Sequence, residues 1–195
     1  FKEYGIENGL KKMYAEWDNI VFTTQEYKAT KTFVIKGYDE IGATLDDHIV
    51  TTQAMTFSPF KKPFEEEILE WNQKLITLSD ILEEWAKAQS QWMYLQPIFD
   101  SPDIAKHLPQ ENKKFKHVDS QWKSIMATAN KEKNVLRVCF PEFENPKEAN
   151  QLLDKLKKAN EDLEDIQKKL NDYLERKREA FARFYFLSND ELLEI

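Results

Sequence analysis

The nearest approach to a catalytic cluster in this sequence is the run Asp46-Asp47-His48. A carboxylate beside an imidazole can act as general acid and base when both groups reach one substrate atom. Successive positions on a helix do not face each other, so these three side chains would not converge. We interpret the run as a solvated helix face. His107 and His117 complete no Glu-x-x-His or His-Glu-x-x-His pair, so surface or partly buried histidines are expected rather than metal ligands.

Two further patterns bear on catalysis. The single cysteine, Cys139, follows Arg137 but has no histidine partner at a suitable position, so we interpret it as a buried structural thiol. The sequence contains no Gly-x-x-x-x-Gly-Lys-Ser/Thr loop and no Gly-x-Gly-x-x-Gly loop, the segments that hold nucleotide phosphates. The sequence therefore predicts no catalytic residue, no cofactor and no metal ion in this chain.

The basic cluster Arg176-Lys177-Arg178 differs from the other lysine pairs because the aromatic run FARFYF (181–186) follows it directly. Two interpretations stay open. The cluster can be favourable charge at a helix C-terminus followed by core aromatics, or it can be part of a docking surface. The docking candidates are Arg178, Arg183, Phe184, Tyr185 and Phe186.

Composition narrows the classes of function. The 195 residues are 41% hydrophobic and 32% charged with only four glycines, which indicates a helix-rich folded chain of one domain or two small ones. The net charge of −7 argues against nucleic acid or an anionic membrane surface as a partner. A single cysteine without glycosylation sequons is typical of a reducing, intracellular compartment. Because the chain begins at Phe1 and ends at Ile195 inside an apparent helix, we expect it to be part of a longer polypeptide.

The first half of the chain combines helical and strand patterns. Apolar spacing predicts a helix over 2–17. The segments 20–27 and 32–38 are rich in β-branched and aromatic residues and predict a β-hairpin around KATK. Asp39 is expected to cap a helix that runs to about Phe57.

The clearest element is a long helix whose apolar residues alternate spacings of four and three, which is a heptad seam. The seam consists of Phe64, Ile68, Trp71, Leu75, Leu78, Leu82, Trp85, Gln89 and Trp92. Pro97 lacks an amide hydrogen, so the helix should kink or end there, with the surrounding aromatics packed on a neighbouring helix. Both a hinge and a rigid corner stay open for this junction, and packed aromatics favour the corner. The junction candidates are Trp85, Gln89, Trp92, Tyr94, Pro97 and Phe99.

The second half repeats the pattern. Ser101-Pro102 predicts a helix start, another helix is expected over 109–131, and VLRVCF (135–140) is either a short strand or an extended connector. Asn145 is expected to cap a third long helix that runs to about Ala180, and Ser188 with Glu191 indicates a further capping box. The overall prediction is a mainly α fold, an elongated antiparallel helical bundle in which the two long helices are neighbours, with a small β-hairpin near residues 20–38. Residues 1–100 and 101–195 are possible halves.

Three segments together resemble the linker region of dynein heavy chains. They are FVIKGYDEIGATLDDHIVTTQAM (33–55), EEWAKAQSQWMYLQPIFDSPDIAKHLPQENKKF (83–115) and NDYLERKREAFARFYFLSNDELLEI (171–195). They occur in the expected order and span nearly the whole chain. One departure is Ala182, where the family commonly has proline. QPIFDSPDI and LPQENKKF are more similar to axonemal than to cytoplasmic heavy chains.

The resemblance implies a mechanical function. In dyneins the linker arches over a ring of six AAA+ modules of the same heavy chain, and it bends and straightens as the ring turns over ATP. It implies ATP and Mg²⁺ in that ring only, partners among dynein intermediate and light chains and microtubules, and a place in the cytoskeleton of a cilium or flagellum. The alternative is a helical scaffold or adaptor outside any motor. P-loop modules after Ile195 in the parent polypeptide would distinguish the two.

Overall fold

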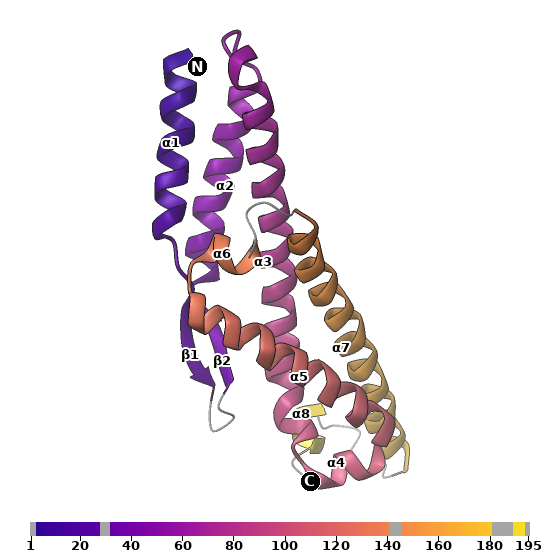
Figure 1. Cartoon of the computed structure of the whole chain (residues 1–195). Coiled ribbons are helices and arrows are strands. Elements are labelled where there is room, and N and C mark those ends of the chain that lie inside the picture. Colours follow the sequence, from indigo (N-terminus) through magenta and orange to yellow (C-terminus); the bar gives the residue numbers. More distant parts are fainter. Residues whose placement is uncertain (1–2, 28–31, 141–145, 181–188, 194–195) are drawn as a thin grey trace. The chain divides into compact units, whose positions relative to one another are not determined.

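The computed structural model describes residues 3–27, 32–140, 146–180 and 189–193, apart from the side chains of residues 3, 146–151, 191 and 192. Within these ranges most residues are helical (Figure 1). In chain order the elements are α1 (Glu3–Asn19), β1 (Thr23–Tyr27), β2 (Thr32–Lys36), α2 (Tyr38–Met55), the 3-10 turn η1 (Lys62–Phe64), α3 (Glu65–Phe99), α4 (Pro102–His107), α5 (Pro109–Glu132), α6 (Val135–Cys139), α7 (Pro146–Ala180) and α8 (Asn189–Leu193). The mainly α fold with a small β-hairpin is confirmed.

The chain forms two compact units that are discontinuous in sequence. Unit 1 comprises Phe1–Ala86 and Lys123–Leu156, and unit 2 comprises Lys87–Trp122 and Lys157–Ile195. Helices α3, α5 and α7 each contribute residues to both units. The halves predicted from the sequence, residues 1–100 and 101–195, refer to subdomains of a longer protein, and that division stays a prediction.

Unit 1 is built around α1, α2 and the first part of α3, which lie side by side in Figure 1. The apolar spacing that predicts α1 also defines its buried face, on which Ile6, Leu10, Met13 and Trp17 are at most 3% exposed. The same rule holds for α2, where Ile41, Leu45 and Met55 are buried. Helical periodicity therefore identified the core side of α1 correctly.

The hairpin forms at the predicted place. Its two strands pair antiparallel, with Thr23 opposite Lys36 and Tyr27 opposite Thr32. The residues of the KATK connection lie outside the described residues. β2 carries the buried face of the hairpin, and Thr24 on β1 donates a hydrogen bond from Oγ1 to Asn130 Oδ1 of α5 at 2.7 Å.

The helix that follows the hairpin begins one residue earlier than Asp39. Gly37 occupies the N-cap position in the left-handed region, with φ of 77°, and no side chain caps this end. The expectation that Asp39 caps the helix is therefore wrong. Asp39 lies in the first turn, where a negative charge still favours the helix dipole.

Helix α3 contains Pro97 in its last turn and ends two residues later at Phe99. The amide of Asp100 still donates to the Gln96 carbonyl at 3.0 Å. The helix therefore continues for two residues beyond Pro97 before it ends. The predicted seam is confirmed from Ile68 to Trp92, whereas its first predicted member, Phe64, lies in η1 and is half-buried. Trp71, Leu75, Leu78, Leu82, Trp85, Gln89 and Trp92 are all buried.

Unit 2 shows which helices run antiparallel. Trp92 packs on Trp122 and Phe99 packs on Phe115, so the α3 and α5 segments run in opposite directions. Lys114 donates a hydrogen bond to Asp165, and His107 stacks on Tyr173. The α4–α5 segment and α7 therefore also run in opposite directions.

Consequently α3 and α7 run parallel to each other within unit 2 (Figure 1). The prediction that the two long helices are antiparallel neighbours is wrong in this respect, because α5 is the antiparallel neighbour of both. A heptad pattern predicts which face of a helix is buried, but it does not predict which other helix packs on that face.

The segment 135–140 is neither a strand nor an extended connector. Residues Val135–Cys139 form the short helix α6, with Asn134 as its N-cap: the Arg137 amide donates to Asn134 Oδ1 at 3.1 Å. Asn134 also donates from Nδ2 to the carbonyls of Trp17 and Asp18 at 3.2 and 3.1 Å. These tertiary contacts outweigh the strand preference of the two valines.

Candidate functional site

The aromatic junction at the end of α3 lies within unit 2 and packs on α5. The Trp92 indole stacks on Trp122 with ring centroids 5.7 Å apart and an interplanar angle of 26°. Its Nε1–H donates to Asp119 Oδ1 at 2.7 Å. Trp92 is fully buried, so a charge-assisted hydrogen bond at this depth fixes both the rotamer of the indole and the register of α3 on α5.

Two turns further on, a second aromatic pair repeats the contact between the same helices. Phe99 stacks on Phe115 with centroids 5.3 Å apart and an interplanar angle of 18°. Pro97 is exposed and lies between the two buried pairs in sequence. The structure thus brings Trp92 and Phe99 together on one helix pair, as the sequence predicted for the region of the proline. Whether the junction acts as hinge or rigid corner stays a prediction.

The remaining junction candidates have different surroundings. Trp85 belongs to unit 1, where it is fully buried and packs against Phe22 at 5.1 Å. Gln89 is buried and is the one polar member of the α3 seam. Tyr94 is half-buried, and burial is the main cause that raises its pKa. The six candidates therefore do not form one cluster.

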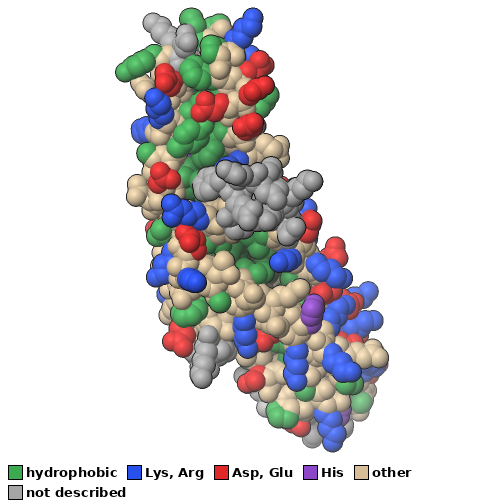
Figure 2. Space-filling model, viewed as in Figure 1, with side chains coloured by type: hydrophobic (Ala, Val, Ile, Leu, Met, Phe, Trp, Pro, Cys, Tyr) green, Lys and Arg blue, Asp and Glu red, His purple; other side chains and the backbone are tan. Residues whose placement is uncertain are grey.

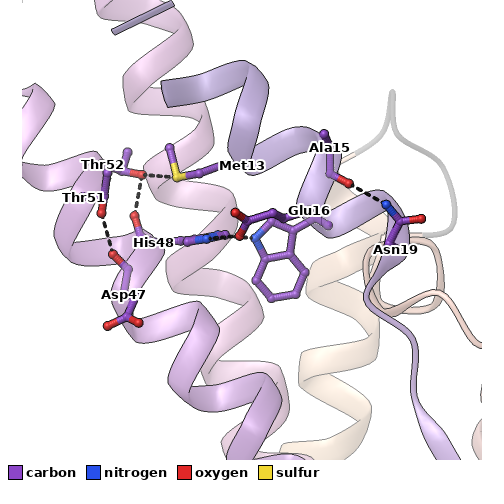
Figure 3. Close-up of polar contacts among 9 residues, drawn as sticks. Met13, Ala15, Glu16, Asn19, Asp47, His48, Thr51 and Thr52 are labelled. Atoms are coloured by element: carbon purple, nitrogen blue, oxygen red, sulfur yellow. Dashed lines mark hydrogen bonds and ion pairs between the residues drawn. The ribbon is translucent and has the colours of Figure 1, made fainter. Parts of the chain in front are cut away.

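A buried polar cluster that the sequence did not predict joins α1 and α2 in unit 1 (Figure 3). His48 of α2 is 9% exposed and lies between two neighbours on α1. The Trp17 indole donates from Nε1 to His48 Nδ1 at 2.8 Å, and His48 Nε2 lies 2.8 Å from Glu16 Oε2. Thr52 donates to the His48 carbonyl at 2.6 Å and contacts Met13 Sδ at 3.6 Å.

These contacts fix one tautomer of the imidazole. An indole N–H can only donate, so Nδ1 of His48 must present its lone pair to Trp17. The proton of the neutral ring then lies on Nε2 and is donated to Glu16. The interpretation of Asp46-Asp47-His48 as a solvated face is wrong for His48, although Asp46 and Asp47 are exposed as expected. The spacing of His48 from the buried Leu45 and Thr52 is the signal that could have placed it on the core face.

Charged residues of α3, α5 and α7 form ion pairs within unit 2. Lys114 lies 2.8 Å from Asp165 and 3.7 Å from the largely buried Asp162, and Lys87 pairs with Glu164. The hydrogen bond with Asp165 is the main cause that raises the pKa of Lys114, and the hydrogen bond with Lys114 is the main cause that lowers the pKa of Asp165. Figure 2 shows basic and acidic side chains mixed on the viewed face of unit 2.

Apolar side chains are exposed at one end of unit 1. Phe57 and Phe60 lie in the α2–α3 connection and are 87% and 46% exposed, and Tyr4 near the start of α1 is 77% exposed. The start of α1 and the α2–α3 connection lie at the same end of unit 1 (Figure 1). Leu69, in the second turn of α3, is 55% exposed. These side chains are not part of the buried core of unit 1.

Cys139 is fully buried on α6, as the sequence predicted for a structural thiol. Burial raises its pKa far above the usual thiol range, so the reactive thiolate is disfavoured at neutral pH. Nearby in unit 1, the Lys74 ammonium lies 5.3 Å from the centre of the Phe140 ring, and burial lowers the pKa of that lysine.

Of the docking candidates, only Arg178 falls within the described residues. It pairs with Glu175 at 3.1 Å and donates from Nη2 to Asn189 Oδ1 at 2.7 Å. Arg183, Phe184, Tyr185 and Phe186 lie outside the described residues.

Neither a metal cluster nor a membrane span is found within the part of the chain that the structure describes. Over these residues, no three histidine, cysteine or acidic side chains come together as a metal would require. The helices described are also too short or too polar to cross a bilayer.

Comparison with known proteins gives matches over the whole chain. Residues 1–195 match the family described as dynein heavy chain, N-terminal region 2. The chain is 48% identical over 194 residues to dynein axonemal heavy chain 1 of Homo sapiens, covering 100% of this chain and 4% of that protein. Identity is 48% to dynein axonemal heavy chain 3 of Homo sapiens and 45% to dynein axonemal heavy chain 12 of Rattus norvegicus, each over 100% of this chain. The chain spans 4% and 6% of those two relatives.

Proposed function

Because this chain belongs to the dynein heavy chain family, within N-terminal region 2, we propose that it is a mechanical element of a dynein motor, the linker. It transmits movement generated by ATP turnover elsewhere in the heavy chain and carries out no chemistry itself. The AAA+ ring of the same heavy chain is its proposed intramolecular partner, with ATP and Mg²⁺ bound there. The resemblance of the three segments to the linker supports this assignment.

The structural observation that carries the proposal is the continuous buried seam of α3. The helix is 35 residues long, and its seam residues are buried within each unit. Bending such a helix separates packed apolar surface, at roughly 25 cal/mol per Å² newly exposed. A helix held in this way resists bending, which a lever requires.

The relatives named axonemal favour a place in a cilium or flagellum. We propose this location, together with microtubules and dynein intermediate and light chains as partners of the parent assembly. The charge of −7 is consistent with protein partners rather than nucleic acid or an anionic membrane.

The test uses two leucines of the same helix in the complete heavy chain. Leu75 is fully buried in the seam, whereas Leu69 is 55% exposed. Leu75→Ala removes seam packing, which for a buried leucine costs about 2–5 kcal/mol. We expect slower microtubule gliding with the ATPase rate retained. Leu69→Ala is the matched control and should change neither rate.

The lever assignment would be rejected if Leu75→Ala lowered ATPase and gliding in the same proportion, or if both variants glided as fast as the unmodified motor. Thermal unfolding of both variants shows whether the seam was weakened. A Leu75→Ala motor with a weakened seam and unchanged gliding would contradict the need for stiffness directly.

A further inference from the structure

A regular pattern of exposed residues runs along the outward side of α2. The positions follow one another at spacings of four, three, four and three, which places them on one side of a helix. They are Ala43, Asp47, Val50, Ala54 and, in the turn that follows the helix, Phe57. All five are exposed, with Val50 at 66% and Phe57 at 87%. We call these five residues the outer stripe, which covers about 21 Å at 1.5 Å per residue.

The outer stripe lies on the side of α2 that faces away from α1. His48 and Thr52 extend from α2 toward α1, whereas Asp47 points away from it (Figure 3). At about 100° per residue, Val50 lies roughly 160° around the helix from each of His48 and Thr52. Helix α1 therefore packs on the opposite face of α2 and does not cover the outer stripe.

The charge around the outer stripe is negative. The sequence of α2 contains no lysine or arginine, and its carboxylates are all exposed: Asp39, Glu40, Asp46 and Asp47. Asp46 and Asp47 precede Val50 by four and three residues, so both carboxylates lie next to Val50 on the helix surface. The nearest cations in sequence are Lys36 before the helix and Lys61 after it. The outer stripe is thus an apolar strip with acidic neighbours.

The charge and the composition of the stripe restrict what can cover it. In a symmetric dimer the same face meets itself, which would bring the acidic residues of two copies together and cost binding energy. A permanently covered face is usually as apolar as a core. The outer stripe instead contains Asp47 and two alanines, whereas the buried face of α2 contains Ile41 and Leu45. Its composition is typical of a contact that forms and separates between different proteins.

We propose that the outer stripe of α2 is a reversible docking site for an amphipathic helix of another protein, in which lysine or arginine flanks the apolar side. Val50 and Phe57 contact the apolar side of that helix, and Ala43 and Ala54 let the two helices approach closely. Asp47 faces a cation, because a charged residue within a heptad stripe selects the residue opposite it. The description of the assembly as a dynein motor rests on the proposed function, whereas the docking site does not depend on the lever.

Hydroxyl-radical labelling of Phe57, read by mass spectrometry, tests whether the stripe is covered and by what. We expect Phe57 to be oxidised in the purified complete heavy chain and protected in the intact assembly. Tyr4, which is 77% exposed on α1, is the reference and should be oxidised in both. Protection in the purified heavy chain at every concentration would assign the stripe to a segment of the same chain, and protection that grows with concentration would assign it to a second copy. Either result, or equal oxidation of Phe57 in both samples, would overturn the proposal.

Two variants of the stripe test its role in the assembly. Asp47→Lys repels the cations of the partner, and Val50→Asp places a charge where an apolar contact is needed. Each should restore oxidation of Phe57 in the intact assembly. Asp18→Lys is the matched control, because it makes the same change at an exposed position of α1 and should leave Phe57 protected. Both altered stripe residues are exposed, so the fold should tolerate the changes, and protection that persists in both variants would contradict the proposal.

A designed peptide tests the chemistry of the stripe directly. The probe is a helical peptide of about 20 residues with leucine at the heptad seam and lysine at the flanking positions, and its binding to the purified heavy chain is measured by fluorescence anisotropy. Asp47→Lys should weaken binding roughly tenfold or more, the scale of one close charge pair at an interface, and Asp18→Lys should leave it unchanged. Equal affinities of the native chain and both variants, or equal binding of a peptide with glutamate at the flanking positions, would overturn the proposed preference for a basic helix.

Discussion

Replacing His48 with leucine should weaken the contact between α1 and α2 in a way that can be calculated from the structure. The change removes the acceptor of the Trp17 indole N–H, and Trp17 is fully buried. A buried donor left without an acceptor costs about 1–3 kcal/mol. The carboxylate of Glu16 also loses its partner, but its side chain is 42% exposed, so water replaces the lost contact at little cost.

Leucine fills nearly the volume of the imidazole, so the cavity contribution is small. We therefore expect about 2 kcal/mol of local destabilisation, most of it from the orphaned indole N–H. Amide hydrogen exchange of α1 and α2 in the heavy chain measures the free energy of this local opening. At 1.4 kcal/mol for each factor of ten, exchange should become roughly 30-fold faster.

Two controls separate the indole contact from the other contacts of His48. Glu16→Gln keeps an acceptor for Nε2–H, so exchange should change by less than about threefold. In a Trp17→Phe background no donor remains, and His48→Leu should then cost much less than in the native background. Equal costs in both backgrounds, or an exchange rate in His48→Leu within twofold of the native rate, would refute the reasoning.

Three further outcomes follow from contacts in both units. Asn134→Ala should destabilise α6 and its junction with α1 by about 2 kcal/mol, because one cap and two carbonyl contacts are lost together; exchange of the α6 amides checks this. Pairing with Lys114 lowers the folded-state pKa of Asp165, so the pair stabilises the fold above about pH 4, the ordinary carboxyl range, and this stabilisation is lost as the pH falls through the lowered pKa. Lys114→Met should remove that pH dependence of stability, and unfolding measured from about pH 6 to pH 2 would show whether it does. Cys139 should resist a maleimide reagent until the chain unfolds, whereas fast labelling of the native protein would contradict its burial.

The elements that the sequence predicted well are those in which one repeated spacing determines one buried face. The α3 seam is the clearest case, because each of Leu75, Leu78 and Leu82 must avoid water whatever covers it. The hairpin was also predictable, since strand preference in 20–27 and 32–38 agreed with the tertiary structure.

The parts that sequence reasoning missed depend on contacts between residues far apart in the chain. α6 is helical because Asn134 caps it while also binding carbonyls of α1 more than 100 positions earlier, and no local pattern encodes that. His48 is buried because Trp17 and Glu16 offer a donor and an acceptor on the facing helix. The run Asp46-Asp47-His48 alone does not show that His48 has these two partners.

The same argument explains why the junction candidates separated into different surroundings. Trp92 and Phe99 differ by seven positions, so helical geometry alone places them on one face, and α5 supplies one aromatic partner to each. Tyr94 is two positions from Trp92 and must point away from that face. A single helix segment thus presents Trp92 and Phe99 to α5 on one face and Tyr94 on another, so substitutions at Trp92 and at Tyr94 should affect different contacts.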